Sequence, residues 1–195
     1  MANVTAAMVK ELRDATGAGM MDCKKALVAA DGDMQKAIDA MRKSGAAKAA
    51  KKAGRTAAEG IIAVAQNGSK VALVEVNSET DFVAKNEEFI GFVEDLAKMV
   101  LETAPASIEA LKESKYMGTE ETVQEVLNGK IAKIGENMNL RRSAREEATG
   151  AVVGYVHGAG KIAVLVNFDS EAAAADLEDL GKDVAMQIAA MNPMY

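Results

Sequence analysis

The sequence has few of the residues on which many catalytic and metal-binding sites depend. It contains one cysteine, Cys23, and one histidine, His157, in 195 residues. One cysteine excludes an intrachain disulfide framework and a zinc site built from several thiolates, and one histidine excludes a site of several imidazoles. The sequence contains no apolar run long enough to span a membrane. The N-terminus also lacks the basic segment followed by an apolar segment that is typical of a signal peptide. We therefore expect a cytoplasmic protein with no membrane contact, metal or cofactor.

Aromatic residues are also scarce, at 4% of the chain, although hydrophobic residues together reach 49%. A chain of this length and composition can bury a core of its own and forms one or two domains. Its charge is unevenly distributed, with a net charge of +5 over residues 1–56 and −11 over residues 57–195. This asymmetry indicates two units. The acidic body argues against nucleic acid as the main partner, because neutralising phosphates requires Lys and Arg.

The first 45 residues are predicted to form a small domain of three short helices. Thr5, Asp22 and Asp33 are each placed to cap a helix, because a short polar side chain can accept a bond from the first free amides. Gly17 lies in a tight turn after the first helix, and Gly45 is expected to end the third. A basic connector rich in Ala and Lys follows at residues 46–59.

The rest of the chain contains a duplicated β-β-α pattern, which predicts an α+β fold. Short β-rich runs surround Asn67-Gly68, a strong hairpin signal, and a helix follows from Glu87. Two further helices are expected near 107–114 and 119–134, and then a strand at 137–148. Two more β-rich runs and a helix repeat the first pattern after residue 150. The expected core subdomains are 60–148 and 149–195, the second of them incomplete.

The two copies differ between their second strand and their helix. The first copy has Thr80-Asp81-Phe82 there, and the second has mostly alanine, so the fold itself does not require these residues. Asn86 can already cap the following helix. Two interpretations remain open. In one, Asp81 caps a short turn and Phe82 packs into the core. In the other, Phe82 projects as an interface wedge and the carboxylate of Asp81 fixes its orientation.

Three motifs carry a resemblance to a known family. They are Leu12–Leu27 (LRDATGAGMMDCKKAL), Thr80–Lys85 (TDFVAK) and Lys133–Arg142 (KIGENMNLRR). Together they resemble bacterial elongation factor Ts, in the family's order and over essentially the whole chain. The resemblance implies a head like ubiquitin-associated domains and a duplicated α+β body. Longer members continue past the helix matching 172–190, so we expect this chain to be a C-terminally shortened member.

The resemblance also implies a function, guanine-nucleotide exchange in translation elongation. Members bind the GTPase elongation factor Tu and speed the release of GDP. By similarity, a wedge segment made of Thr80, Asp81, Phe82 and Val83 would enter between helices of the GTPase domain and disturb its Mg²⁺ and phosphate sites. This role needs no covalent chemistry, so we expect neither an enzyme nor direct nucleotide binding.

Other positions match family contacts with the GTPase. In the head these are Leu12, Arg13, Met20, Met21 and Lys24, and in the second subdomain the match is His157. Each has a simpler interpretation. Leu12, Arg13, Met20 and Met21 could belong to the head core, Lys24 could be a solvated lysine, and His157 could be a partly exposed residue at a hairpin end. Cys23 is expected to be an inert, partly buried thiol.

Two other classes of function stay open. The chain lacks the Gly-x-x-x-x-Gly-Lys-[Ser/Thr] loop of Walker-type NTPases, and Gly17-Ala18-Gly19 lacks the preceding strand of a dinucleotide site, so an enzyme is disfavoured. The second class is a passive binding module, which binds a partner without changing the kinetics of nucleotide release. A wedge and an anchor use the same residue types, so the sequence does not distinguish them.

Overall fold

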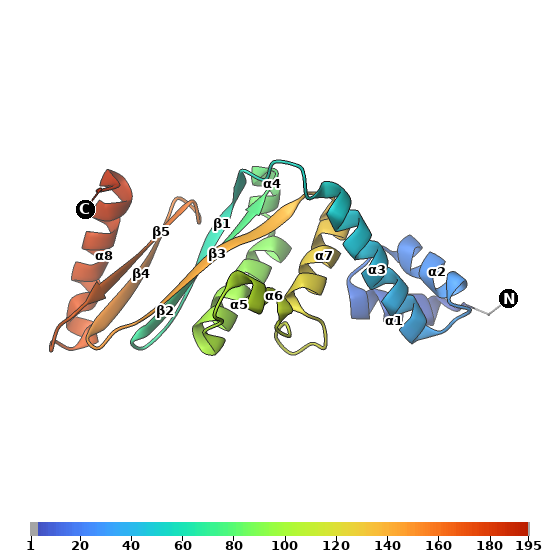
Figure 1. Ribbon diagram of the computed structural model, residues 1–195, viewed down its shortest axis with the longest axis horizontal. Coiled ribbons are helices and arrows are strands. Elements are labelled where there is room, and N and C mark those ends of the chain that lie inside the picture. The colour runs from blue at the N-terminus through green and yellow to red at the C-terminus, as the bar shows by residue number, and fades with distance from the viewer. Residues whose placement is uncertain (1–3, 195) are drawn as a thin grey trace. The chain divides into compact units, whose positions relative to one another are not determined.

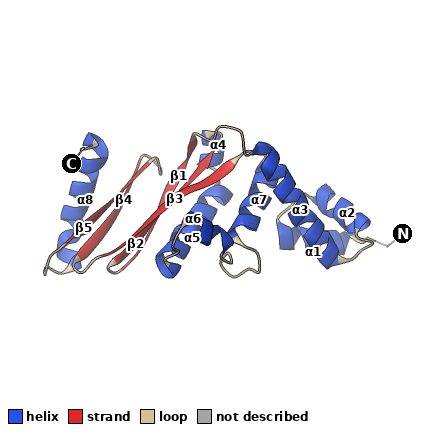
Figure 2. Ribbon diagram, viewed as in Figure 1, coloured by secondary structure: helices blue, strands red, loops and turns tan. Residues whose placement is uncertain are grey.

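A computed structural model describes residues 4–194, which form two compact units. The first unit extends to Thr56 and includes Glu113–Asn137, and the second contains Ala57–Lys112 and the residues from Met138 onward. The regular elements of the first unit are all helices, whereas the second contains both strands and helices (Figures 1 and 2). The predicted α+β class is confirmed. No described helix is long and apolar enough to cross a membrane.

The first unit begins with three helices, α1 (Ala6–Thr16), α2 (Met20–Ala29) and α3 (Met34–Lys52). Two of the predicted caps are confirmed: the hydroxyl of Thr5 accepts a bond from the Met8 amide at 3.3 Å, and the Asp33 carboxylate accepts one from the Lys36 amide at 3.0 Å. The third predicted cap, Asp22, was wrong. Helix α2 begins at Met20 after Gly19, with no side-chain cap, and Asp22 lies in its first turn.

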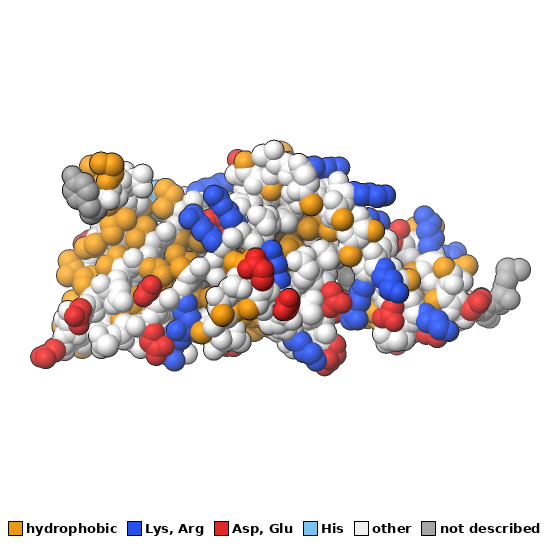
Figure 3. All heavy atoms as spheres, in the orientation of Figure 1, with side chains coloured by type: hydrophobic (Ala, Val, Ile, Leu, Met, Phe, Trp, Pro, Cys, Tyr) orange, Lys and Arg blue, Asp and Glu red, His pale blue; other side chains and the backbone are white. Residues whose placement is uncertain are grey.

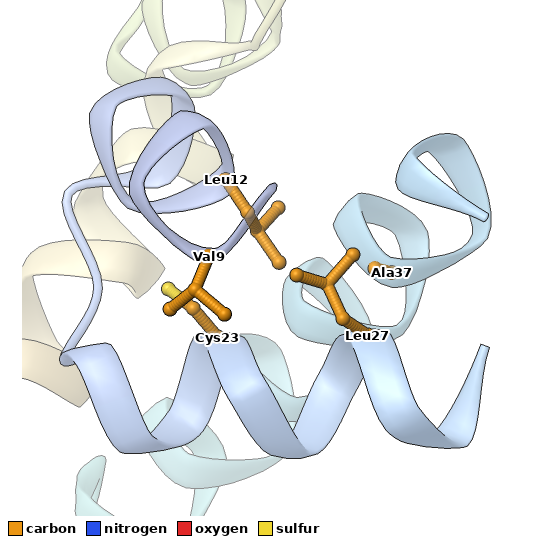
Figure 4. Packing of buried hydrophobic residues seen from close by; sticks show 5 residues of the cluster. All are labelled: Val9, Leu12, Cys23, Leu27 and Ala37. Atoms are coloured by element: carbon orange, nitrogen blue, oxygen red, sulfur yellow. The ribbon is translucent and has the colours of Figure 1, made fainter. Parts of the chain in front are cut away.

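The core of this unit joins all three helices. Val9 and Leu12 of α1 meet Cys23 and Leu27 of α2, and Ala37 of α3 closes the cluster (Figure 4). The Cys23 thiol is free and buried, as expected for an inert residue. Small side chains at Cys23 and Ala37 let the helices approach closely around the two leucines.

The predicted end of the third helix at Ser44-Gly45 was wrong, because α3 continues to Lys52. A later helix, α7 (Val123–Ile134), packs along it. A side chain at Gly45 would lie 3.8 Å from the Asn128 carbonyl of α7, and Arg42 pairs with Glu121 at 3.2 Å. Tertiary packing therefore overrides the weak local stop signal. The expected connector at 46–59 is thus partly helical.

The second unit begins with an antiparallel sheet in the order β1-β2-β3. Its strands are β1 (Glu59–Asn67), β2 (Lys70–Ser78) and β3 (Met138–Glu147), so the strand expected at 137–148 is confirmed. Helix α5 (Glu87–Thr103) packs on β1 and β2 through a buried apolar stripe. The short helices α4 (Asp81–Ala84) and α6 (Ile108–Glu113) flank α5 in the sequence.

The second copy of the pattern is also confirmed, as the hairpin of β4 (Ala151–His157) and β5 (Ile162–Phe168) followed by α8 (Ala174–Met191). Alternate residues of β4 face opposite ways. A side chain at Gly154 would come within 2.6 Å of Val64 in β1, whereas one at Gly181 of α8 would come within 2.4 Å of Val153. The hairpin therefore lies between the first sheet and α8. Hydrophobic side chains gather on the surface over this hairpin and helix (Figure 3).

Candidate functional site

The wedge segment is fixed at both ends by helix caps. The hydroxyl of Thr80 accepts a bond from the Val83 amide at 3.4 Å and begins α4. Ser78 in turn donates to the Thr80 carbonyl at 3.0 Å. Asn86 caps α5 as predicted, because its side chain accepts bonds from the amides of Glu88 and Phe89. Only one helical turn separates the two caps, so the backbone between them has little freedom.

The side chains of α4 face in different directions. Val83 and Ala84 are buried against β1 and β2, which both contact α4. Phe82 is 81% exposed. The interpretation in which Phe82 packs into the core is therefore wrong, and so is the one in which Asp81 caps the turn, because Thr80 does so. Val83 holds the segment in place and offers little surface to a partner.

Asp81 carries a negative charge beside the exposed ring. Its carboxylate accepts a hydrogen bond from the Lys85 ammonium at 2.7 Å. That bond and the charge of Lys85 lower the pKa of Asp81, and the same pairing raises the pKa of Lys85. Because Asp81 and Lys85 are one helical turn apart, the ion pair also restricts where the carboxylate can point. Both groups are charged at neutral pH.

The turn of the second hairpin packs against the start of β1, which α4 also contacts. The Ile62 amide donates to the Gly160 carbonyl at 2.7 Å, and Lys161 pairs with Glu59 at 2.5 Å. The charge of Lys161 also contributes to lowering the pKa of Asp81. Lys161 and Glu59 were not identified from the sequence, since only the fold brings them close to Asp81 and Lys85.

His157 lies where the second hairpin turns, as predicted, and is exposed. Its Nδ1 lies 2.9 Å from the Tyr155 hydroxyl, and the two rings are tilted with centroids 6.0 Å apart. This contact orients the imidazole without covering it. The structure therefore leaves His157 available to a partner.

The head presents a separate apolar surface on α2. Met20, Met21 and Val28 are more than half exposed, and Arg13 and Lys24 are exposed as well. We call these five residues the head surface. Val28 was not identified from the sequence, although it follows Met21 by two helical turns. Leu12 is a correction: it is fully buried in the head core and cannot contact a partner directly.

The arrangement offers surfaces for contact. Among residues 4–194, no group of three Asp, Glu, His or Cys side chains is placed to hold a metal ion. The exposed features of the candidate site include an aromatic ring beside a carboxylate in one unit and the head surface in the other. Exposed aromatic and methionine side chains of this kind are typical of protein interfaces.

Comparisons with known proteins agree on one family. A family model described as "Elongation factor TS" matches residues 79–195. Curated proteins named Elongation factor Ts are 58% identical in Clostridioides difficile (strain 630), 54% in Methylorubrum extorquens (strain PA1) and 55% in Sphingopyxis alaskensis. Each match covers 99–100% of this chain and 65% of the relative. Because the family model covers more than half of the chain and the relatives match nearly all of it, the chain belongs to the elongation factor Ts family.

Proposed function

We propose that the chain acts in translation elongation as a guanine-nucleotide exchange factor for elongation factor Tu. The observation that carries this proposal is the exposure of Phe82 on the short, doubly capped helix α4. An apolar ring held in water by a fixed backbone gains free energy when a partner covers it. Because the segment is already ordered, little conformational entropy is lost on binding.

The proposed mechanism is a wedge. Phe82 enters between helices of the GTPase domain, and Asp81 fixes the direction of entry. GTPases hold their nucleotide largely through Mg²⁺ and backbone amides around the phosphates, so a small displacement of these groups weakens the grip on GDP. A partner that prefers the displaced conformation lowers the affinity for GDP by the same factor, because the coupling between the two sites is reciprocal.

The head surface provides the anchor in this proposal. Met20, Met21 and Val28 supply adaptable apolar contacts, and Arg13 and Lys24 add positive charge around them. Leu12 supports this surface from the core beneath it. His157 provides a further polar contact from the second unit. Contacts of this kind set the affinity, whereas the wedge segment sets the rate of GDP release.

Release of a fluorescent GDP analogue from elongation factor Tu tests the wedge. The chain should accelerate release, and Phe82→Ala should reduce that acceleration by at least about 10-fold, the effect of losing one central interface residue. Asp81→Ala should have a smaller effect in the same direction. Met117→Ala is the matched control, because Met117 is an exposed apolar residue outside both proposed contact surfaces. It should leave release unchanged.

The binding affinity, measured in parallel, separates the exchange factor from a passive anchor. Tight binding without any acceleration would contradict the exchange role and favour a binding module. Equal loss of acceleration in Phe82→Ala and Met117→Ala would contradict the wedge assignment. Circular dichroism of each variant shows whether it is folded. Phe82 is exposed, so its replacement should not disturb the core.

A further inference from the structure

The second copy of the β-β-α pattern lacks the wedge residues, yet the turn of its hairpin lies against the strand on which α4 packs. Strand β1 is an edge strand of the first sheet, so the backbone groups on its outer side have no partner in that sheet. The turn supplies one, because the Ile62 amide donates to the Gly160 carbonyl at 2.7 Å. Lys161, the next residue of the turn, donates to the Glu59 carboxylate and to the Gly60 carbonyl.

The turn and the start of β1 fit closely together. A Cβ atom added at Gly160 would lie 2.9 Å from the Cβ atom of Ile61, and the φ angle of Gly160 is +88°. Glycine tolerates both the angle and the approach, because it has no Cβ atom. Backbone contact and the two bonds from Lys161 therefore dock the turn on β1.

Hydrogen bonds continue from the start of β1 to the wedge segment. Glu59 is opposite Ser78 in the β1-β2 pair, and the Glu59 carbonyl accepts a bond from Asn77 Nδ2 at 3.1 Å. Ser78 donates to the carbonyl of Thr80, which caps α4. Helix α4 itself packs on β1 and β2. A displacement at the start of β1 would therefore reach the backbone that carries Phe82.

Two ion pairs meet at this place, Glu59 with Lys161 and Asp81 with Lys85. They also act on each other. The pKa of Asp81 is lowered mainly by its hydrogen bond with Lys85, and the charge of Lys161 adds to this effect. The pKa of Lys85 is raised mainly by Asp81, and the charge of Glu59 adds to that effect. Lys85 is thus attracted to both carboxylates, and Lys161 weakens the competition by neutralising Glu59.

We propose that Lys161 of the second hairpin is a positioning residue for the wedge segment. It docks the turn on the start of β1, and by neutralising Glu59 it leaves Lys85 to hold the carboxylate of Asp81. The inference rests on the proposed exchange function, because it assigns to the second copy the task of orienting Asp81 and Phe82 for entry into the GTPase. A wedge already held in its binding orientation loses less conformational entropy when it binds. Lys161 acts through its neighbours and needs no contact with the partner.

NMR of the 195-residue chain at low salt tests the positioning without the GTPase. The carboxyl ¹³C signal of Asp81 gives its pKa, and the amide and ring signals of Phe82 report the orientation of the wedge segment. Lys161→Met should raise the pKa of Asp81 towards its ordinary value, because it removes an attracting charge and lets Lys85 turn towards Glu59. It should also shift the signals of Phe82. Lys161→Arg, which keeps the charge, should leave the pKa of Asp81 nearly unchanged.

Lys70→Met is the matched control. Lys70 pairs with Glu147 at 3.4 Å, and the side chains of Lys70 and Lys161 are both 46% exposed. Lys70 lies at the other end of the β1-β2 pair from Glu59, so its loss should leave the signals of Asp81 and Phe82 unchanged. In the GDP-release assay at saturating chain, Lys161→Met should slow release by about 3-fold and Lys70→Met by less than about 1.5-fold, in keeping with the modest strength of exposed ion pairs.

Two results would overturn the positioning role. Equal changes at Asp81 and Phe82 in Lys161→Met and Lys70→Met would mean that the wedge segment responds to net charge or to overall stability, which thermal unfolding of both variants measures. Slower GDP release in Lys161→Met with unchanged signals at Asp81 and Phe82 would mean that Lys161 contacts the partner directly. If the unchanged chain fails to accelerate GDP release, the exchange function is wrong, and the NMR comparison still decides the positioning.

Discussion

Glu75 shows how one residue can set the local charge of this fold. Its burial alone would raise the pKa of the carboxyl, but hydrogen bonds from Arg142, Asn77 and Arg141 together outweigh burial and lower it below the ordinary value of 4.5. The carboxylate is therefore ionised at neutral pH and links β2 to the bulged strand β3. Removing its charge leaves two guanidinium groups without their partner.

Glu75→Gln should lower the free energy of unfolding at pH 7 by about 1–3 kcal/mol, the usual cost of an unmet polar contact. A carboxyl with a depressed pKa stabilises the folded state above its unfolded pKa and loses this effect as pH falls through its folded pKa. The difference in free energy of unfolding between the unchanged chain and Glu75→Gln should therefore narrow below about pH 4.5. Urea unfolding of both proteins over a pH series measures this difference.

The exposed pair of Glu178 and Lys182 on α8 provides the control for this prediction. Glu178→Gln also removes one carboxylate from a hydrogen-bonded ion pair, but both side chains lie in solvent. It should change stability much less than Glu75→Gln. Equal effects of the two substitutions would contradict the role assigned to the buried carboxylate.

Single residues of the candidate site were predictable to different degrees. The comparison of the two copies singled out Thr80, Asp81 and Phe82, because the second copy lacks them. The sequence did not show that Phe82 points outward and Val83 inward. Which of the two side chains is exposed depends on how α4 packs on β1 and β2. Leu12 was placed among the contacts because it matches a family position, and the alternative that it belongs to the head core is the one its burial supports.

Elements with strong local signals were predicted well. The hairpin at Asn67-Gly68 and the caps at Thr5, Asp33 and Asn86 all depend on interactions within a few residues. Helix α3 was predicted to be too short, because the signal at Gly45 is local and the packing that overrides it comes from α7. Element boundaries therefore failed where a distant segment supplies the contact.

Two glycines within helices test how closely the elements pack against one another. Gly181 of α8 lies so close to Val153 that an added methyl group would come within 2.4 Å of its Cγ2 atom. Gly181→Ala should therefore destabilise the protein by about 1–3 kcal/mol, the cost of overpacking a core. Gly91 of α5 has nothing within 4 Å of an added methyl group. Gly91→Ala should raise stability by up to about 1 kcal/mol, because alanine favours helix.

Thermal or urea unfolding of both variants measures these opposite changes in the free energy of unfolding. The two substitutions are chemically identical and both lie inside helices, so helix propensity acts equally on them. A gain in stability for Gly181→Ala would contradict the close contact between α8 and β4. A loss for Gly91→Ala would mean that the exposed side of α5 is more crowded than its position indicates.

At the scale of the whole molecule, chain order and compact units do not coincide. Residues 113–137 belong with the N-terminal helices, although 56 residues of the other unit separate them from Thr56. The sequence did not show that residues 113–137 belong with the N-terminal helices. The buried stripe of α7, which includes Val123, Leu127 and Ile131, fits many apolar surfaces. The charge asymmetry predicted two units and placed their boundary from sequence order alone.

A fragment of residues 1–56 tests how the first unit is held together. The first half of α3 packs into the head core through Ala37, whereas Gly45 of the second half faces α7. Without α7, residues 34–41 should keep their amide protection in hydrogen exchange, and residues 45–52 should lose it. A helical segment of eight residues with no packed face is too short to be stable in water.

The composition of this segment supplies the opposing effect. Residues 45–52 are mostly alanine and lysine, which favour helix without any packing. Equal protection of both halves of α3 in the fragment would mean that intrinsic propensity extends the helix and that α7 only packs on a surface already formed. Restoring α7 by using the whole chain gives the reference protection. If α7 determines the length of α3, protection at residues 45–52 should rise by at least about 10-fold in the whole chain, equivalent to about 1.4 kcal/mol of added local stability.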